Sequence, residues 1–569
     1  MGVRAGVSLV MLLSLITAAC GEGAARRSAT EMPAGISVQD VSRTLVVVSR
    51  TEPSTFVSEE LNPTHTGNTP DAAWQIFHAE LAQPDEAGVS RLQLAEAAPQ
   101  LGTSSWKVFP DGRMETTWLL RPNLTWHDGA PLVADDFVLS IQFQKSVGKG
   151  GLTKGTSEVE GAIAPDPRTL VIQYKSPFPL AGEVAWQPLP RHILGSSLEE
   201  ADGRNPAEGF SLPYWTTEFV GLGPYKLERW EPGAFITGVA FPGYVDGKPR
   251  IGRIQLVWQP DGNTVVANLL SGTVHLATDL SLVFDQTPVL KREWASKAQP
   301  GSILLGTAKT VFARPQFRPE YARPAAMLDV RFRQALAYAI DKQSIVDAVM
   351  DGEPAMADTL VAKEEDYYAE LDRALTKYPL DLRRTDQLLT EMGFTKDGEG
   401  FYGQGGNRLS IQIMPLSNYQ REALILVDSW KRAGIESPIR TLSAAEQLDG
   451  EIGKTYPAIA ITQFSIKPDP FPYFNSANLA TPATRWFGAN GGGYYDAEVD
   501  RLSDLYNASL DRNDRNRAAI QGMALVTSQA ANFPLYYAKE VVAHTGNLTG
   551  PRAGLKKYAM SKVEEWRWQ

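Results

Sequence analysis

The chain has a single cysteine, Cys20, among 569 residues. One thiol excludes an intramolecular disulfide and any metal site built from several cysteines. The six histidines stand singly, and neither an H-E-x-x-H zinc motif nor a G-x-S-x-G nucleophile elbow occurs. A net charge of -10 without a basic stripe argues against a nucleic-acid partner. We therefore expect no enzyme activity, no metal site, no cofactor and no nucleic-acid binding.

Long apolar runs are also missing, apart from one near the N-terminus. The run Val7–Ile16 follows Arg4 and is too short to span a bilayer permanently. Small residues at 17–19 stand directly before Cys20, an order that resembles a bacterial lipobox. This resemblance implies a signal peptide over residues 1–19, lipidation of the Cys20 thiol and a lipidated tether over residues 20–40. Ordinary signal cleavage that leaves Cys20 free is the alternative.

The most informative stretch is residues 120–137, which read LRPNLTWHDGAPLVADDF. Met114–Leu120, which leads into it, has the aliphatic, Thr and Trp content of a half-buried strand. His127-Asp128-Gly129 predicts a tight turn, in which Gly129 is free to take a positive φ. Asp135-Asp136 stands in a first helical turn, where the helix dipole favours anions. The residues alone therefore predict a strand–turn–helix joint.

Read whole, this stretch resembles the signature of the family 5 (dipeptide/oligopeptide-type) solute-binding proteins of ABC importers. Three further segments resemble the same family: Val220–Trp230 (VGLGPYKLERW), Asp329–Val349 (DVRFRQALAYAIDKQSIVDAV) and Asp511–Gln529. The resemblance spans nearly all of residues 41–537. In this context His127-Asp128 is expected to be a turn and not a general base with its orienting carboxylate.

A chain of 569 residues is too long for one core, so more than one domain is expected. The resemblance implies an α/β fold with two lobes, the periplasmic-binding-protein-like fold of type II, cluster C, with an extra subdomain in the first lobe. Lobe I is expected over residues 41–285, with the extra subdomain at about 81–205. Lobe II is expected over residues 286–524, and residues 525–569 return to lobe I.

Local pattern predicts several individual elements. The aliphatic run Thr44–Ser49 (TLVVVS) predicts a buried strand, and Leu409–Met414 predicts another. Asp71–Leu81 predicts a helix, with His78 as a core residue and not a ligand. Asp341 is placed to cap the helix that follows it.

The segment Thr462–Phe474 (TQFSIKPDPFPYF) resembles a ligand-binding loop of the family, anchored by Asp469-Pro470. In the family's peptide binders, an aspartate four residues before that proline holds the α-ammonium group of the peptide. Ile466 stands at this position and offers no charge. The ligand-binding residues implied by the resemblance are Glu52, Ser54, Trp215, Thr462, Gln463, Phe464, Ser465, Ile466 and Tyr494.

We expect the ligand to be an extended, amphipathic small molecule, either peptide-like or glycosidic. Main-chain groups near Glu52 and Ile466 would set its pose, and aromatic side chains would pack against its body. Without a carboxylate at position 466, a buried α-ammonium group would be unpaired. Free-amine peptides should therefore bind worse than N-blocked, cyclic or neutral glycosidic ligands, unless Glu52 or Asp469 turns inward to supply the charge.

The function implied is that of an extracytoplasmic solute-binding protein, a monomer that delivers its ligand to an ABC permease and ATPase complex. The protein would be lipid-anchored at the outer face of the cytoplasmic membrane, in the periplasm or on the cell surface. Hinge closure around the ligand would be its mechanism. Two alternatives are an envelope lipoprotein that keeps the fold for an interaction or regulatory role without transport, and an extracytoplasmic hydrolase, for which no motif is present.

Overall fold

The computed structural model describes residues 43–58, 61, 71–84, 90–146, 157–184, 186–200, 212–353, 355–467, 469–552 and 559–569. Cys20 and the predicted signal and tether segments lie outside these residues and stay predictions. Among the described residues, no helix combines the length and the apolar character that crossing a membrane requires.

A nine-stranded mixed sheet is the main framework of the described chain. Its strand order is β17-β18-β13-β19-β12-β1-β11-β10-β9. The strands are β1 (Thr44–Ser49), β9 (Tyr225–Glu231), β10 (Phe235–Ala240), β11 (Arg253–Trp258), β12 (Leu276–Ala277), β13 (Ser302–Pro315), β17 (Ile413–Pro415), β18 (Ile459–Ser465) and β19 (Phe533–His544).

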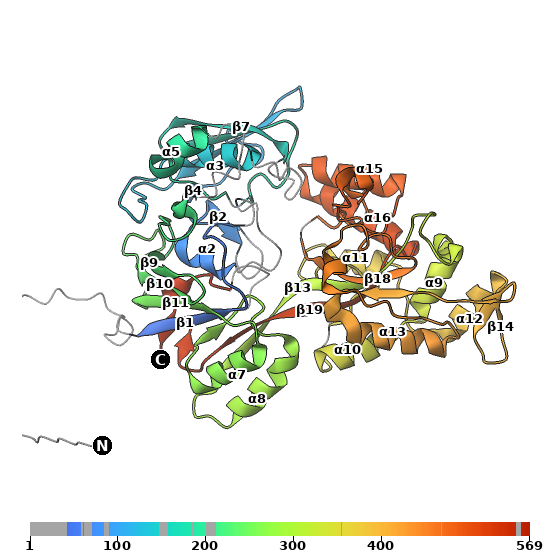
Figure 1. Ribbon diagram of the computed structural model, residues 1–569. Helices are drawn as coiled ribbons and strands as arrows, with labels where there is room; N and C mark the ends of the chain where they lie inside the picture. The colour runs from blue at the N-terminus through green and yellow to red at the C-terminus, as the bar shows by residue number, and fades with distance from the viewer. Residues whose placement is uncertain are drawn as a thin grey trace, which may run out of the picture. The chain divides into compact units, whose positions relative to one another are not determined.

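Strands β13 and β19 are the longest of the sheet and run side by side as an antiparallel pair (Figure 1). The pairing extends from Ser302 opposite His544 to Ala313 opposite Phe533. At one end of the pair β12 joins β19, and at the other end β18 joins β13. The strands of lobe I and lobe II therefore belong to one sheet, joined through β13 and β19. Since β13 pairs beside strands of both lobes, the lobe boundary at residues 285 and 286 stays a prediction.

Lobe I contains the parallel pair β1–β11, whose register runs from Thr44 opposite Arg253 to Ser49 opposite Trp258. This aliphatic strand has the bounds that the sequence predicts. Helix α2 (Ala72–Phe77) is fully buried and packs in the same core. The other elements of this part of the chain are α7 (Gly262–Ser271), β20 (Leu548–Thr549) and β21 (Arg567–Trp568). Helix α8 (Thr287–Ala295), which packs against α7, lies just past the predicted lobe boundary.

A second sheet, of five strands, carries a core of its own with Trp118, Trp126 and Phe137. Its order is β4-β6-β8-β7, with β5 paired to β6. The prediction for β6 is confirmed in both bounds. The strands are β4 (Ala95–Ala97), β5 (Trp106–Val108), β6 (Met114–Leu120), β7 (Val159–Asp166) and β8 (Thr169–Tyr174). The same part of the chain contains α3 (Ala134–Ser146), α5 (Arg191–Glu200) and a separate two-stranded sheet of β2 (Ala82–Pro84) and β3 (Ser90–Leu92).

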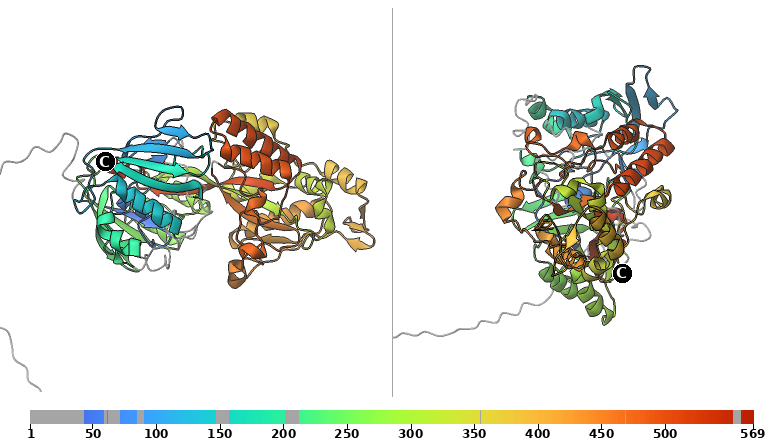
Figure 2. Two further views of the ribbon diagram at one scale, coloured as in Figure 1. Left: turned by 90° about the horizontal axis from the view of Figure 1, so that it is seen from above. Right: turned by 90° about the vertical axis from the view of Figure 1, so that its right-hand side faces the viewer.

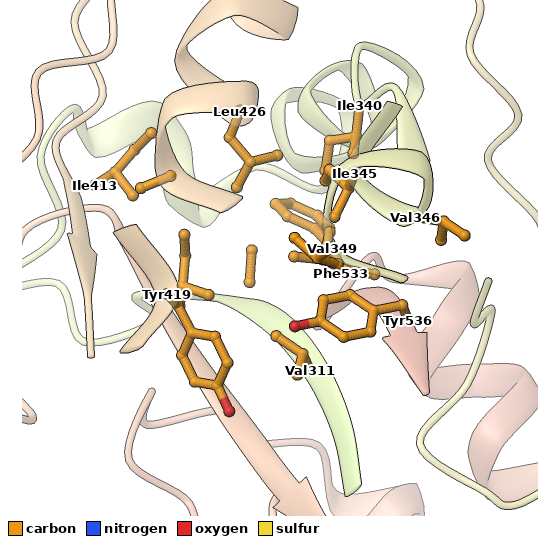
Figure 3. Packing of buried hydrophobic residues seen from close by; sticks show 14 of the residues in the cluster. Val311, Ile340, Ile345, Val346, Val349, Ile413, Tyr419, Leu426, Phe533 and Tyr536 are labelled. Atoms are coloured by element: carbon orange, nitrogen blue, oxygen red, sulfur yellow. The ribbon is translucent and has the colours of Figure 1, made fainter. Parts of the chain in front are cut away.

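In lobe II, alternate residues of β13 enter cores on opposite faces of the sheet, as the pleat of a strand requires. Val311 packs with Ile413, Leu426 and Phe533 in the core shown in Figure 3. The helices of this part of the chain are α9 (Val330–Tyr338), α10 (Lys342–Met350), α12 (Leu382–Glu391), α13 (Gln420–Arg432) and α14 (Ala444–Leu448). A small three-stranded antiparallel sheet is formed by β14 (Thr395–Lys396), β15 (Tyr402–Gln404) and β16 (Asn407–Arg408).

The other face of β13 presents Phe312, which packs with Phe464 and Phe474. Residues of α11 (Tyr368–Ala374), α15 (Ala497–Ala508) and α16 (Arg512–Ser528) complete this second core. Helices α15 and α16 lie side by side (Figure 2). Each begins at an aspartate whose side chain accepts backbone N–H groups of the first turn, Asp496 for α15 and Asp511 for α16.

Three local predictions can be compared with the structure. Asp341 caps α10 by accepting from the backbone N–H of Ser344, as expected. The helix predicted over Asp71–Leu81 ends earlier, at Phe77, because His78 is extended and its ring bonds the neighbouring backbone. The strand predicted at Leu409–Met414 is wrong in extent, since β17 begins at Ile413. Ser410 forms only an isolated bridge to Glu436.

Candidate functional site

The His127-Asp128-Gly129 turn is a joint between distant segments. His127 accepts the backbone N–H of Gly221 at Nδ1 (3.2 Å) and donates from Nε2 to the carbonyl of Gly223 (3.0 Å). The residue is buried, and burial lowers the pKa of its imidazole to about 4. Gly129 has φ +93°, as predicted. These contacts favour a structural role for the turn.

Strands β1 and β18 both end in the direction of the middle of the β13–β19 pair, one from each end of the pair. Strand β1 runs beside β12 toward it, since Val48 pairs Ala277, which in turn lies opposite Ala543. Strand β18 ends toward it from the other side, with Ser465 opposite Lys309. Residues 52–54, predicted to bind the ligand, come shortly after β1. Residues 462–466, the other predicted segment, form the end of β18 and the residue after it. The register therefore directs the C-terminal ends of β1 and β18 toward the same stretch of the sheet, while Glu52 itself lies at the β9–β10 turn.

In that stretch β13 and β19 have only each other as partners among the described strands. Leu304–Thr307 pairs with Lys539–Val542, beyond the reach of both β12 and β18. The register shifts between Thr307 and Lys309, where one extra residue interrupts the ladder. A bulge of this kind bends a strand and raises its local twist.

The carboxylate of Glu52 is engaged in lobe I. Its Oε1 accepts Trp230 Nε1 at 2.9 Å, and both oxygens lie within 3.2 Å of the backbone N–H of Gly233. Gly233 lies in the turn between β9 and β10, with φ +77°. Ser54, two residues further along, is exposed. Glu52 could supply charge to a ligand only by leaving these three hydrogen bonds.

Asp279, just after β12, is a half-buried acid beside the end of β1 that the sequence did not point out. Its carboxylate accepts the backbone N–H groups of Asp71 (3.3 Å) and Ala72 (3.0 Å), and its carbonyl accepts from Arg50. Burial and the charges of Asp71 and Glu540 raise its pKa to about 8. Asp279 and Leu280 have φ +49° and +59°, a strained conformation for residues other than glycine.

The end of β18 is held by two tyrosines. Strand β17 stops at Pro415 opposite Ile461, so residues 462–465 have no strand on that side in the described part of the chain. The hydroxyl of Tyr473 donates to the carbonyl of Gln463 at 3.2 Å, and that of Tyr419 bonds the Gln463 side chain. Thr462, Gln463, Ser465 and Ile466 are half-buried. These residues present main-chain groups and polar side chains, and Ile466 adds no charge.

The three aromatic residues predicted to contact the ligand lie in cores. Phe464 is 2% exposed and packs edge-on against Tyr473, with ring centroids 4.8 Å apart. Tyr494 is 3% exposed and contacts Phe317, and Trp215 is 2% exposed and stacks on Phe143 at 5.6 Å. Their contact with a ligand stays a prediction, and it requires these side chains to leave those cores.

Other aromatic rings near these loops are open to solvent. Tyr495 is 64% exposed and Phe487 is 71% exposed. Each lies within nine residues of Tyr494 in the segment between β18 and α15. Packing between distant segments determines which aromatic rings are buried and which are exposed. The sequence carries no signal for that packing.

Neither a metal site nor an obvious cavity points to a different function. No group of three His, Cys, Asp or Glu side chains among the described residues is arranged to hold a metal ion. One small pocket lies between α10 and the start of β19, where Lys342 and Asp358 form an ion pair at 2.8 Å. None of the predicted ligand-binding residues lines it.

Residues 96–484 match the sequence model of the bacterial extracellular solute-binding proteins, family 5. The chain belongs to this family. The oligopeptide-binding protein AppA of Bacillus subtilis is 25% identical over 575 residues, which cover 98% of this chain and 97% of AppA. The dipeptide-binding protein of Escherichia coli is 24% identical, over 94% of this chain and 95% of its own length.

Solved structures of family 5 proteins share the fold. AppA of Bacillus subtilis in complex with a nonapeptide superposes with a TM-score of 0.69 and 21% identity, over 93% of this chain and 99% of AppA. NikA of Brucella suis in complex with Fe(III)-EDTA gives 0.73 and 19% identity, over 92% of this chain and 100% of NikA. The predicted family and two-lobed α/β fold are confirmed. The predicted role as a solute-binding protein of ABC transport is confirmed as well. The alternative, an envelope role without transport, is not favoured.

Proposed function

We propose that this family 5 protein captures a peptide-like or other extended amphipathic solute between its lobes and delivers it to an ABC permease and ATPase complex. The observation that carries this proposal is that β1 and β18, one from each lobe, both end in the direction of the stretch where β13 and β19 pair alone among the described strands. Binding and release leave the solute unchanged, with no catalytic step.

The two-strand stretch is the natural hinge. Among the described strands, Leu304–Thr307 and Lys539–Val542 pair only with each other, so bending there breaks no described ladder to a third strand. The register shift after Thr307 already bends β13. A ligand that contacts the segments at both strand ends favours the closed arrangement by its differential affinity for the two states.

Hydrogen bonds to main-chain groups would set the pose of the ligand without fixing its identity. A sheet edge pairs with an extended backbone, and its N–H and C=O groups can also meet sugar hydroxyls. The edge of β18 past Ile461 is the candidate, and Thr462, Ser465 and Ile466 are half-buried there. The relatives bind different ligands on this fold, a nonapeptide in AppA and Fe(III)-EDTA in NikA. An extended solute is therefore compatible with the family, and a peptide is one member of that class.

The nearby carboxylates do not readily replace the charge that Ile466 lacks. Glu52 is bonded to Trp230 and Gly233, and one oxygen of Asp469 accepts from the backbone N–H of Phe471 at 2.9 Å. Burying an α-ammonium group without a partner costs several kcal/mol, roughly 3–5. Ligands without a free amine, whether N-blocked, cyclic or glycosidic, are therefore favoured.

Mass spectrometry and calorimetry together test the proposal. Gently purified protein should retain a small molecule visible by native mass spectrometry. In calorimetry, an N-acetylated peptide should bind at least as tightly as its free-amine twin. Tighter binding of the free-amine form that is abolished in Glu52→Gln would show that Glu52 supplies the charge. Failure of every extended solute to bind would contradict the proposal.

The anchor and the partners are proposed from the sequence. Cys20, after the short apolar segment, would carry the lipid at the outer face of the membrane, with the protein as a monomer beside its permease. Cys20→Ser should change the mature mass and release the protein from membranes. Equal mass and equal membrane association of the two forms would contradict lipidation. Loss of uptake of the identified solute in a deletion strain would separate transport from a purely structural envelope role.

A further inference from the structure

Three cationic side chains gather where β13 ends in lobe II. They are Arg314, Arg318 and Lys454, and their mutual repulsion adds to burial in lowering the pKa of Lys454 to about 7. Arg314 is only 7% exposed, and its Nε donates to the hydroxyl of Tyr456 at 3.0 Å. Its guanidinium carbon lies 5.5 Å from the centre of the Tyr456 ring. This is a concentration of positive charge in a mostly buried place.

No described carboxylate forms an ion pair with these cations, and Glu320 acts on Arg318 only from a greater distance. In the described part of the chain, every carboxylate oxygen is more than 4.0 Å from the side-chain nitrogens of Arg314, Arg318 and Lys454, so none forms an ion pair with them. Arg318 donates to backbone carbonyls of Lys454 (3.3 Å), Gly491 (2.9 Å) and Ala480 (2.7 Å). Within the same described residues, neither the Lys454 ammonium group nor the terminal nitrogens of Arg314 form a hydrogen bond. Donors of both residues therefore remain available.

The surrounding backbone is built closely around the two guanidinium groups. A Cβ atom at Gly491 would lie 2.6 Å from Nη1 of Arg314, and one at Gly493 would lie 2.6 Å from Cγ of Arg318. Between them, a Cβ at Gly492 would approach the carbonyl of Pro315 to 2.7 Å. Only a run of three glycines lets this loop pass so near. The arginines are thus held in place by packing and not by carboxylates.

The Lys454 segment is fixed by the same part of β13 and its extension. Gln316 is fully buried and donates from Nε2 to the carbonyls of Lys454 (3.0 Å) and Tyr456 (2.8 Å). Arg318 also lies over the Trp486 ring at 5.9 Å. Elements distant in sequence therefore place three positive charges close together, and Arg314 and Lys454 keep unused donors. Hydrogen bonds to carbonyls and ring contacts offset part of the cost in repulsion and desolvation, but no ion pair among the described residues does.

We propose that Arg314, Arg318 and Lys454 form a binding site for an oxyanion, a carboxylate, sulfate or phosphate group. The terminal nitrogens of Arg314 and the Lys454 ammonium group donate to the anion, and Arg318 contributes charge while its own N–H groups hold the loop. The site does not depend on the ligand proposed between the lobes. None of the residues predicted to bind that ligand belongs to it.

Sulfate is the first probe, because it does not titrate near neutral pH. At fixed ionic strength, sulfate in place of chloride should raise the melting temperature of the full-length protein, as any ligand specific for the folded state does. Lys454→Met keeps an unbranched side chain of similar length and should abolish the effect, and Arg318→Gln should reduce it. The matched control is Lys431→Met on α13, an exposed lysine, which should respond like the wild type.

The same lysine provides a second measurement. Without sulfate, Lys454→Met should be at least as stable as the wild type, because it removes repulsion from Arg314 and Arg318. With sulfate the order should reverse. Since the pKa of Lys454 is about 7, calorimetric affinity for sulfate should fall about tenfold from pH 6.0 to pH 8.5, and Lys454→Met should lose this dependence.

Acetate and phosphate, tested in parallel, distinguish a site for a carboxylate from a site for a tetrahedral anion. Preference for acetate would assign the site to an acidic group of an organic ligand, and preference for sulfate and phosphate would assign it to an inorganic anion. Equal stabilisation by sulfate and chloride, or an equal sulfate effect in wild type and Lys454→Met, would overturn the proposal.

Discussion

His127 donates from Nε2 to the carbonyl of Gly223, which lies 96 residues further along the chain, at 3.0 Å. Its Nδ1 accepts the backbone N–H of Gly221, so the neutral ring bonds both ends of a three-residue stretch. That stretch crosses the C-terminal end of α2, where Gly223 N–H donates to the carbonyl of Phe77. The most recognisable sequence motif of the chain thus joins three segments of lobe I.

The first prediction concerns this crossing. A Cβ atom at Gly223 would lie 2.4 Å from the backbone carbon of Phe77 and 2.5 Å from the nitrogen of His78. Backbone cannot yield as a side chain does, so Gly223→Ala should destabilise the protein by about 1–3 kcal/mol, the usual cost of overpacking. Gly398→Ala is the control, because nothing lies within 4 Å of its Cβ position. Equal urea midpoints for the two variants would contradict this account.

The second prediction is a loss of stability in acid. Burial is the main cause that lowers the pKa of His127 to about 4 and that of His78 to about 3, from 6.5. Below pH 6.5 the unfolded chain takes up protons that the folded protein excludes. Each histidine should therefore lower the free energy of unfolding by about 1.4 kcal/mol per pH unit as pH falls from 6.5 toward 4.

Urea unfolding between pH 7.5 and pH 4.5 measures this effect. His127→Gln removes one of the histidines that exclude a proton in the folded state, so its stability should depend less steeply on pH than that of the wild type. The absolute stability of the variant is not the readout, since Gln cannot replace both ring contacts. Parallel curves for the two proteins would show that the His127 imidazole is accessible to protons in the folded state.

The third prediction is a loss of stability as pH rises, opposite to the loss in acid predicted for the histidines. Burial and the neighbouring charge of Asp366 raise the pKa of Glu365 to about 7, from 4.5. The folded protein holds this proton when the unfolded chain has lost it, so stability is lost as pH rises from 4.5 through 7. Glu365→Gln should therefore melt at a higher temperature than the wild type at pH 8, with a smaller difference at pH 5. Glu370→Gln, at an exposed position nearby, is the control.

The fourth prediction concerns position 466. Ile466→Asp should make the protein prefer a free-amine peptide over its N-acetylated twin by about tenfold, the usual worth of a charge-assisted hydrogen bond. Ile466→Asn is the matched control, because it has the shape of aspartate without the charge and should show no such preference. If aspartate and asparagine behave alike in calorimetry, Ile466 does not face the amine of a bound peptide.

Local interactions account for what the sequence by itself determined. The strands Thr44–Ser49 and Met114–Leu120, the Asp341 cap and the positive φ of Gly129 all follow from neighbours a few residues away. The family, and with it the two-lobed fold and the solute-binding role, was also readable, because its motifs are runs of consecutive residues.

Tertiary structure decided the features whose partners lie far apart in the chain. Phe464 and Tyr494 are apolar enough for a ligand surface or for a core, and only packing against Tyr473 and Phe317 made them core residues. Arg314 and Lys454 are ordinary cations until the fold brings them together, since the charge of a buried group depends on what else is buried with it. No local sequence pattern predicts that these two side chains lie close together, because they are more than a hundred residues apart in the chain.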